Sequence, residues 1–120
     1  MQAFGKLVRD RIPDIIRQQG ETPVIEVLSD DQYSKELNKK LTEEVGEYLE
    51  SRELDELADV LEVIDVICKA RGTSMDGLQK IRAEKFKKRG GFSEKIFLCQ
   101  KSKQITSQSC ELSKGRPHIC

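Results

Sequence analysis

The spacing of apolar residues predicts a mainly α-helical chain. Two segments, residues 29–50 and 53–71, carry apolar residues three and four positions apart, the spacing typical of amphipathic helices. A third helix is expected to begin at Ser74 and to run to about residue 88. Ser29, with Gln32 three residues later, is the pattern of a helix N-cap. Gly72 and the pair Gly90–Gly91 follow the second and third segments, as glycine commonly does where a helix ends.

A shorter helix and a minor β element are also expected. Residues 4–20 contain a basic segment and then a short helix, which Pro13 opens and Gly20 closes. Residues 22–27 are rich in β-branched side chains and read as a short strand. Residues 95–98 are a second strand candidate, and the two strands could pair.

The helix expected at 53–71 is apolar on two opposite faces. At about 100° per residue, one face carries Leu54, Leu57, Ala58, Leu61, Ile64 and Cys68. The opposite face carries Glu56 and Asp59 among Val60, Val63, Val66 and Ile67. A helix that is apolar on both sides is buried on both. The two carboxylates are therefore expected in largely dry surroundings.

The preceding helix brings further acids toward the same place. Its apolar stripe consists of Leu37, Leu41, Val45 and Tyr48. Glu44 falls inside this stripe and Glu47 at its edge. An antiparallel hairpin that turns at residues 51–52 would bring both glutamates level with Glu56 and Asp59.

Such a cluster needs compensation for its charge. Carboxylates about 5–7 Å apart repel by roughly 2–3 kcal/mol per pair at an effective dielectric near 20, against a net stability of about 5–15 kcal/mol for a typical domain. Either the acids take up protons or a multivalent cation binds. Oxygen ligands without His or Cys favour Mg²⁺, with Mn²⁺ as an alternative. The competing interpretation is a solvated or lysine-paired cluster, with Lys39 and Lys40 as partners.

The acidic pattern resembles the metal signature of the all-α NTP pyrophosphohydrolases, a superfamily that includes MazG-like proteins. It reads Glu-x-x-Glu and, after a short gap, Glu-x-x-Asp. The opening segment Lys-Leu-Val-Arg-Asp-Arg-Ile-Pro at 6–13 and the closing Lys85-x-x-x-Arg89-Gly-Gly-Phe are similar to a small phosphoribosyl-ATP pyrophosphohydrolase-like branch. The resemblance covers about residues 4–98, and the polar remainder, 99–120, is expected to be a disordered tail.

The resemblance implies cleavage of a nucleoside triphosphate between its α and β phosphates, which yields a monophosphate and pyrophosphate. The family's metal ligands correspond to Glu44, Glu47, Glu56 and Asp59. Glu43 would be an outer acid or the base that orients the attacking water, so Glu43 and Glu44 are the catalytic candidates. Two alternatives stay open: the same reaction on phosphoribosyl-ATP, and a non-catalytic helical module whose acids bind a basic partner.

Basic residues near both ends of the domain are candidates for binding the substrate's phosphates. They are Lys6, Arg9, Lys85 and Arg89. A polyphosphate needs cationic donors beside the metal, and arginine can bind it through two hydrogen bonds. Arg9 could instead pair with Asp10 or Asp14.

Composition limits the partners and the location. The chain has 120 residues with 21 basic and 21 acidic side chains, so no chain-wide field attracts nucleic acid or an anionic membrane. It contains no apolar run of about 18 residues and no secretory signal at its start. We therefore expect a cytoplasmic protein whose partners are a nucleotide and further copies of itself, without membrane or nucleic acid.

A homodimer follows from the two apolar faces of the 53–71 helix. One small chain cannot cover both, so Val60, Val63, Val66 and Ile67 are expected to meet a second copy in a four-helix arrangement.

The cysteines give no strong indication of a function. Cys68 lies in an apolar helical stretch and is expected to be a buried thiol. Four residues near the end could supply zinc ligands: Cys99, Cys110, His118 and Cys120. Their spacing matches no compact zinc motif, so reduced thiols are expected there.

Overall fold

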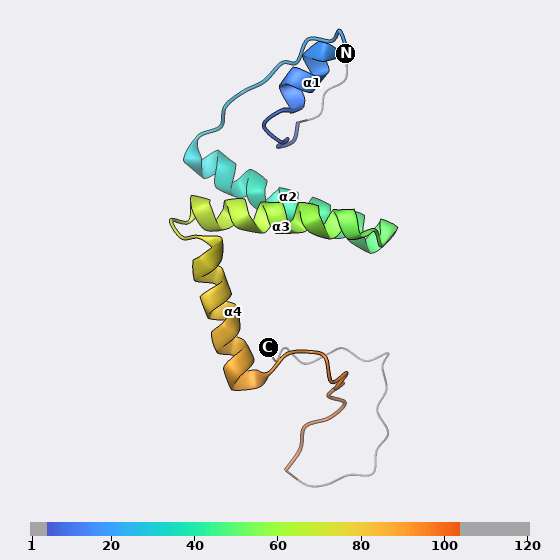
Figure 1. The fold of residues 1–120 in the computed structure, drawn as a ribbon, viewed down its shortest axis with the longest axis vertical. Helices are drawn as coiled ribbons and strands as arrows, with labels where there is room; N and C mark the ends of the chain where they lie inside the picture. The colour runs from blue at the N-terminus through green and yellow to red at the C-terminus, as the bar shows by residue number, and fades with distance from the viewer. Residues whose placement is uncertain (1–4, 104–120) are drawn as a thin grey trace. The chain divides into compact units, whose positions relative to one another are not determined.

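The computed structural model describes residues 5–103, which are mainly α-helical (Figure 1). The helices are α1 (Ile12–Gln18), α2 (Asp30–Ser51), α3 (Leu54–Ala70) and α4 (Met75–Arg89). Each matches a helix predicted from the sequence, within a few residues at either end. The described residues form two compact units, which divide within α4 between Leu78 and Gln79. Among the helices described, none combines the length and apolar character that crossing a bilayer requires.

The predicted β element is wrong. Neither 22–27 nor 95–98 forms a strand in the described part of the chain. Val24 and Val27 are 85% and 92% exposed, so their β-branched side chains have no surface to pack on. A strand needs a neighbouring backbone and a covered face, and propensity supplies neither.

The start of α2 is defined by a capping box. Ser29 Oγ accepts a hydrogen bond from the backbone N–H of Gln32 at 3.3 Å, and Gln32 Oε1 accepts one from the backbone N–H of Ser29 at 3.2 Å. Asp30 and Asp31 lie in the first turn, where the helix dipole favours negative charge. The N-cap predicted from the sequence is therefore confirmed.

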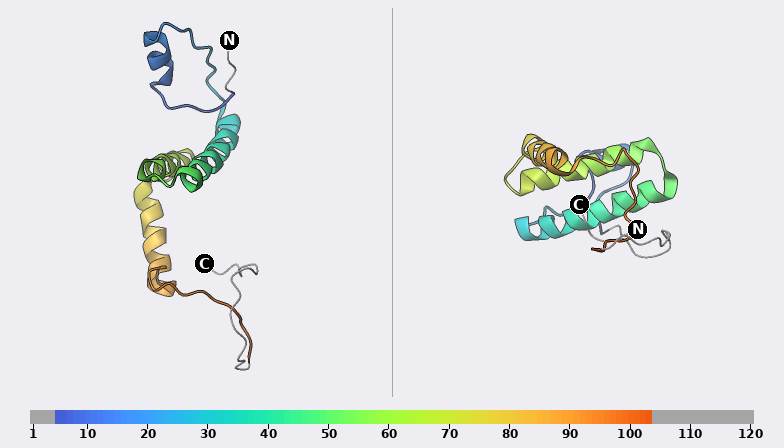
Figure 2. Two further views of the ribbon diagram at one scale, coloured as in Figure 1. Left: turned by 90° about the vertical axis from the view of Figure 1, so that its right-hand side faces the viewer. Right: turned by 90° about the horizontal axis from the view of Figure 1, so that it is seen from below.

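A tight turn at Arg52 reverses the chain between α2 and α3. Arg52 adopts the left-handed conformation with φ of 61°, and its backbone N–H donates to the Tyr48 carbonyl at 2.7 Å. Its side-chain Nε donates to the Leu49 carbonyl at 2.9 Å. The two helices consequently run side by side in opposite directions (Figure 2).

The small core lies between α2 and α3. The buried apolar residues of the described chain are Leu37 on α2 and Val63 and Cys68 on α3. Leu54 and Leu61 are 78% and 54% exposed. The valine-rich side of α3 thus turns toward α2, and its predicted contact with a second copy stays a prediction. Periodicity showed that α3 has two apolar faces, but it could not tell which of them α2 covers.

Of the cysteine predictions that fall on described residues, one is confirmed and one is wrong. Cys68 is a buried free thiol, as expected. Cys99 takes part in a disulfide bond, which contradicts the reduced thiol expected there. The other zinc candidates, Cys110, His118 and Cys120, lie outside the described residues, as does most of the predicted tail, 99–120.

Replacing Ser29 tests whether the cap sets the start of the acidic helix. Ser29→Ala removes the oxygen that accepts the Gln32 N–H, and we expect the free energy of unfolding to fall by about 1 kcal/mol. Ser34→Ala, at an exposed position inside the same helix, is the control and should leave stability within about 0.5 kcal/mol. Urea unfolding followed by circular dichroism measures both. Equal effects would contradict the assigned cap.

Candidate metal centre

The hairpin brings acidic side chains of α2 and α3 together. Two groups of carboxylates have oxygen atoms that all lie within 4.8 Å of one another: Glu43, Glu44 and Glu47, and Glu44, Glu56 and Asp59. Glu44 belongs to both groups, so it joins the acids of α2 to those of α3. The convergence predicted from the sequence is therefore present in part: Glu44 lies with Glu47 in one group and with Glu56 and Asp59 in the other.

Glu44 is the most enclosed member of this acidic cluster. It is only 6% exposed, which makes it the buried charged residue of the described chain. Its Oε1 lies 3.2 Å from Lys40 Nζ, whereas its Oε2 is buried without a hydrogen-bond partner. Buried polar atoms are nearly always paired, so this oxygen is short of a donor or a cation.

Two acids of the cluster, Glu44 and Glu56, have raised pKa values. Burial raises the pKa of Glu44; Lys40 lowers it in part, and the neighbouring Glu47 carboxylate raises it again. The pKa of Glu56 is also raised, by loss of hydration first and then by the negative charge of Asp59. Both acids are therefore harder to ionise than in water, first because they lose hydration and then because neighbouring carboxylates add negative charge.

Lys40 supplies positive charge from within the hairpin. Its Nζ lies 3.3 Å from Glu43 Oε1 and 3.2 Å from Glu44 Oε1, and its side chain is only 17% exposed. Burial lowers the pKa of Lys40, but the hydrogen bond to Glu44 and the charge of Glu43 outweigh this, so the net change is upward. Lys39 instead contacts Glu36 at 3.2 Å.

The lysine-paired interpretation is thus realised for Lys40 and not for Lys39. The site residues predicted from the sequence did not include Lys40. The signal was its spacing, three residues before Glu43 and four before Glu44, at which side chains meet on a helix.

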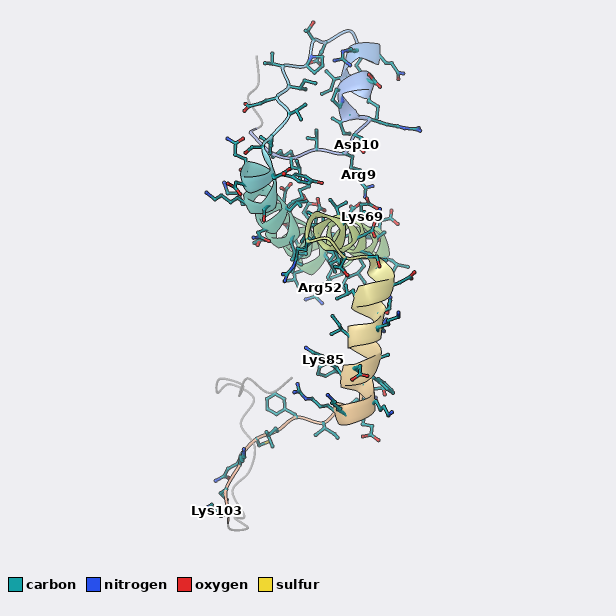
Figure 3. All side chains as sticks on the ribbon, turned by 90° about the vertical axis from the view of Figure 1, so that its left-hand side faces the viewer. Arg9, Asp10, Arg52, Lys69, Lys85 and Lys103 are labelled. Atoms are coloured by element: carbon teal, nitrogen blue, oxygen red, sulfur yellow. The ribbon has the colours of Figure 1, made fainter. Side chains whose placement is uncertain are left out.

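The basic segment before α1 reaches the cluster from outside the hairpin. Arg9 contacts Asp59, with 2.7 Å between Nη2 and Oδ1, and extends toward the hairpin in Figure 3. Lys6 Nζ lies 3.6 Å from Glu43 Oε1. The alternative pairing of Arg9 with Asp10 or Asp14 is wrong, because its salt bridge is with Asp59, and Asp14 contacts Arg17 at 2.8 Å. Two of the four predicted phosphate-binding residues therefore lie beside the acids.

The other two, Lys85 and Arg89, belong to the second unit. Both are exposed in the C-terminal half of α4, and Lys85 is labelled in Figure 3. The acidic cluster lies in the first unit, so the phosphate-binding role of Lys85 and Arg89 stays a prediction.

Comparison with known proteins assigns no activity. No family model and no solved structure matches this chain. A protein of Mycolicibacterium smegmatis, described only as uncharacterized, is 62% identical over 44 residues, which is 37% of this chain and 45% of that protein. The matching part therefore spans less than half of the relative's length.

The raised pKa of Glu44 predicts how stability depends on pH in EDTA. The folded protein keeps the Glu44 proton to higher pH than the unfolded chain, whose value is near 4.5. The free energy of unfolding should therefore fall as the pH rises from 4.5 through the raised pKa. Urea unfolding between about pH 4 and 8 measures this dependence.

Glu44→Gln should make that pH profile flatter, with the remaining slope due to groups such as Glu56. Glu50→Gln, at an exposed position on the same helix, should keep the slope of the unchanged protein. A profile that Glu44→Gln leaves unaltered would show that Glu44 ionises normally.

Proposed function

We propose that this chain is a Mg²⁺-dependent nucleotide pyrophosphohydrolase, with Mn²⁺ as the alternative ion. It would hydrolyse a nucleoside triphosphate between the α and β phosphates to a monophosphate and pyrophosphate. The observation that carries the proposal is the buried, unpartnered Glu44 Oε2 at the junction of carboxylates from two helices. The resemblance of the acidic pattern to the all-α NTP pyrophosphohydrolases supplies the reaction.

The donor set fits a hard divalent cation. Glu44, Glu47, Glu56 and Asp59 offer carboxylate oxygens alone, which is the ligand type that Mg²⁺ and Mn²⁺ prefer. A bound ion would neutralise charge on phosphate oxygens and lower the pKa of a water molecule. A cation there would also give Glu44 Oε2 the partner it lacks.

The remaining roles fall to the chain's other charged side chains. Glu43, held by Lys6 and Lys40 through its Oε1, would accept a proton from the attacking water or orient it. Lys6 and Arg9 have side chains that are 46% and 59% exposed. Each can therefore turn from a carboxylate to a phosphate oxygen without leaving a buried position, and Arg9 can donate two parallel hydrogen bonds.

Ordinary nucleoside triphosphates and phosphoribosyl-ATP are both candidate substrates, because no residue of the cluster distinguishes a base or an extra ribose. A panel of NTPs, dNTPs and phosphoribosyl-ATP, each with Mg²⁺ or with EDTA, separates them by the pyrophosphate released. A helical interaction module without catalytic activity would release none and would bind its basic partner equally well in EDTA.

Charge-removing variants test the assigned ligands. Glu47→Gln or Asp59→Asn should lower Mg²⁺-dependent pyrophosphate release by about a hundredfold or more, because each removes a ligand oxygen. Both should stay folded in EDTA, since each also removes a repelling charge. Glu50→Gln and Asp55→Asn, exposed acids on the same two helices, should remain fully active. Full activity in Glu47→Gln and Asp59→Asn would refute the site.

The proposal includes a homo-oligomer, at least a dimer, because α3 still exposes an apolar face. Leu54, Leu57 and Leu61 lie along it and are 78%, 41% and 54% exposed, and a contiguous apolar patch of this kind marks an interaction site. Light scattering after size-exclusion chromatography should therefore give at least twice the 13.7 kDa chain mass.

Leu57→Asp combined with Leu61→Asp should convert the oligomer to a monomer. Val24→Asp, at another exposed apolar position outside the helices, should leave the mass unchanged. A compact monomer at micromolar concentration in the unchanged protein would contradict the oligomer.

A further inference from the structure

Lys40 differs from the other cations at the acidic cluster in how deeply it is enclosed. Its side chain is 17% exposed, against 46% for Lys6 and 59% for Arg9. It also contacts two carboxylates of the cluster, whereas Lys6 and Arg9 each contact one. Lys40 is therefore the internal cation of the hairpin, and Lys6 and Arg9 approach from its surface.

The formal charge at the cluster is not balanced by these cations. Five carboxylates (Glu43, Glu44, Glu47, Glu56 and Asp59) meet the three cationic side chains of Lys6, Arg9 and Lys40. With all groups ionised, two negative charges are in excess, which is the charge that one divalent ion would neutralise. The enclosed, unpartnered Glu44 Oε2 marks where the excess is least compensated.

Lys40 and a divalent ion would compete for the same residue. Glu44 is common to both carboxylate groups, and its Oε1 already contacts the Lys40 ammonium at 3.2 Å. An ion held by Glu44 would lie a few ångströms from that ammonium, and like charges at such distances repel strongly in a poorly hydrated site. Lys40 has a second partner in Glu43, at 3.3 Å, which is not among the proposed metal ligands.

We propose that Lys40 is an internal counter-ion that shares Glu44 with the divalent cation. In the metal-free protein the ammonium bridges Glu43 and Glu44; when the cation binds Glu44, the ammonium keeps Glu43 alone. This inference rests on the proposed metal-dependent function and assigns Lys40 a role opposed to that of the metal ligands. A compact ammonium on a flexible stem suits such an exchange, because it can move between acceptors on one helix face.

The test replaces Lys40 by methionine and measures two properties that do not require substrate. Titration calorimetry with MgCl₂ and with MnCl₂ should show the dissociation constant lowered about threefold to tenfold in Lys40→Met, because the competing positive charge is gone. Thermal unfolding in EDTA should show the melting temperature lowered by about 2–5 °C, because Glu44 loses its cation. Magnesium should restore the melting temperature.

The neighbouring lysine supplies a matched control. Lys39→Met removes the same charge one residue away, from a side chain that is 74% exposed and contacts Glu36 instead. It should change neither the metal affinity nor the melting temperature in EDTA beyond error. Lys40→Arg, which keeps the positive charge, should not tighten metal binding. Lys40→Gln, whose amide can still donate to Glu43, provides a second neutral variant if Lys40→Met fails to fold.

The outcomes separate this inference from the proposed function. Metal binding that is unchanged or weaker in both neutral variants would overturn the competition while leaving the metal site intact. Absence of divalent-ion binding in the unchanged protein would refute the metal site itself and, with it, the exchange. Tighter binding in Lys40→Met together with a lower melting temperature in EDTA, and neither change in Lys39→Met, supports the proposal.

Discussion

Repulsion between the carboxylates that gather around the buried Glu44 is the constraint on which the rest of this structure depends. The residues that place α3 against α2 also place Glu44 among other acids, because the buried Val63 lies on the same face of α3 as Glu56 and Asp59. Packing and charge therefore oppose each other in the same interface. The hairpin is stable because hydrophobic contact and positive charge together outweigh this repulsion.

Positive charge comes to the cluster from two parts of the chain. Lys40 acts locally, from the preceding turn of α2, whereas Arg9 acts from a segment fifty residues away from Asp59. The local contact persists whenever α2 is helical, since helix geometry alone sets it. The distant one depends on how the segment before α1 lies on the hairpin. The exposed contact of Arg9 adds little stability by itself, so its position at the acids matters more than its energy.

The apolar residues of the hairpin divide into a buried set and an exposed set. The buried apolar residues of the hairpin are Leu37, Val63 and Cys68, whereas the leucines on the far side of α3 are exposed. A small hydrophobic core gives limited stability to a chain of this size. The acid-bearing face of α3 thus turns toward α2, whereas the leucine face stays exposed.

The sequence by itself determined the helices, the Ser29 cap, the turn at residues 51–52 and the approach of the acids of α2 to those of α3, because these follow from periodicity, local hydrogen bonding and antiparallel geometry. Only the tertiary structure decided which face of α3 is covered, that 22–27 stays unpaired, and that Arg9 contacts Asp59 and not Asp14. Each of these depends on contacts between residues distant in the chain, for which side-chain spacing along one helix carries no information.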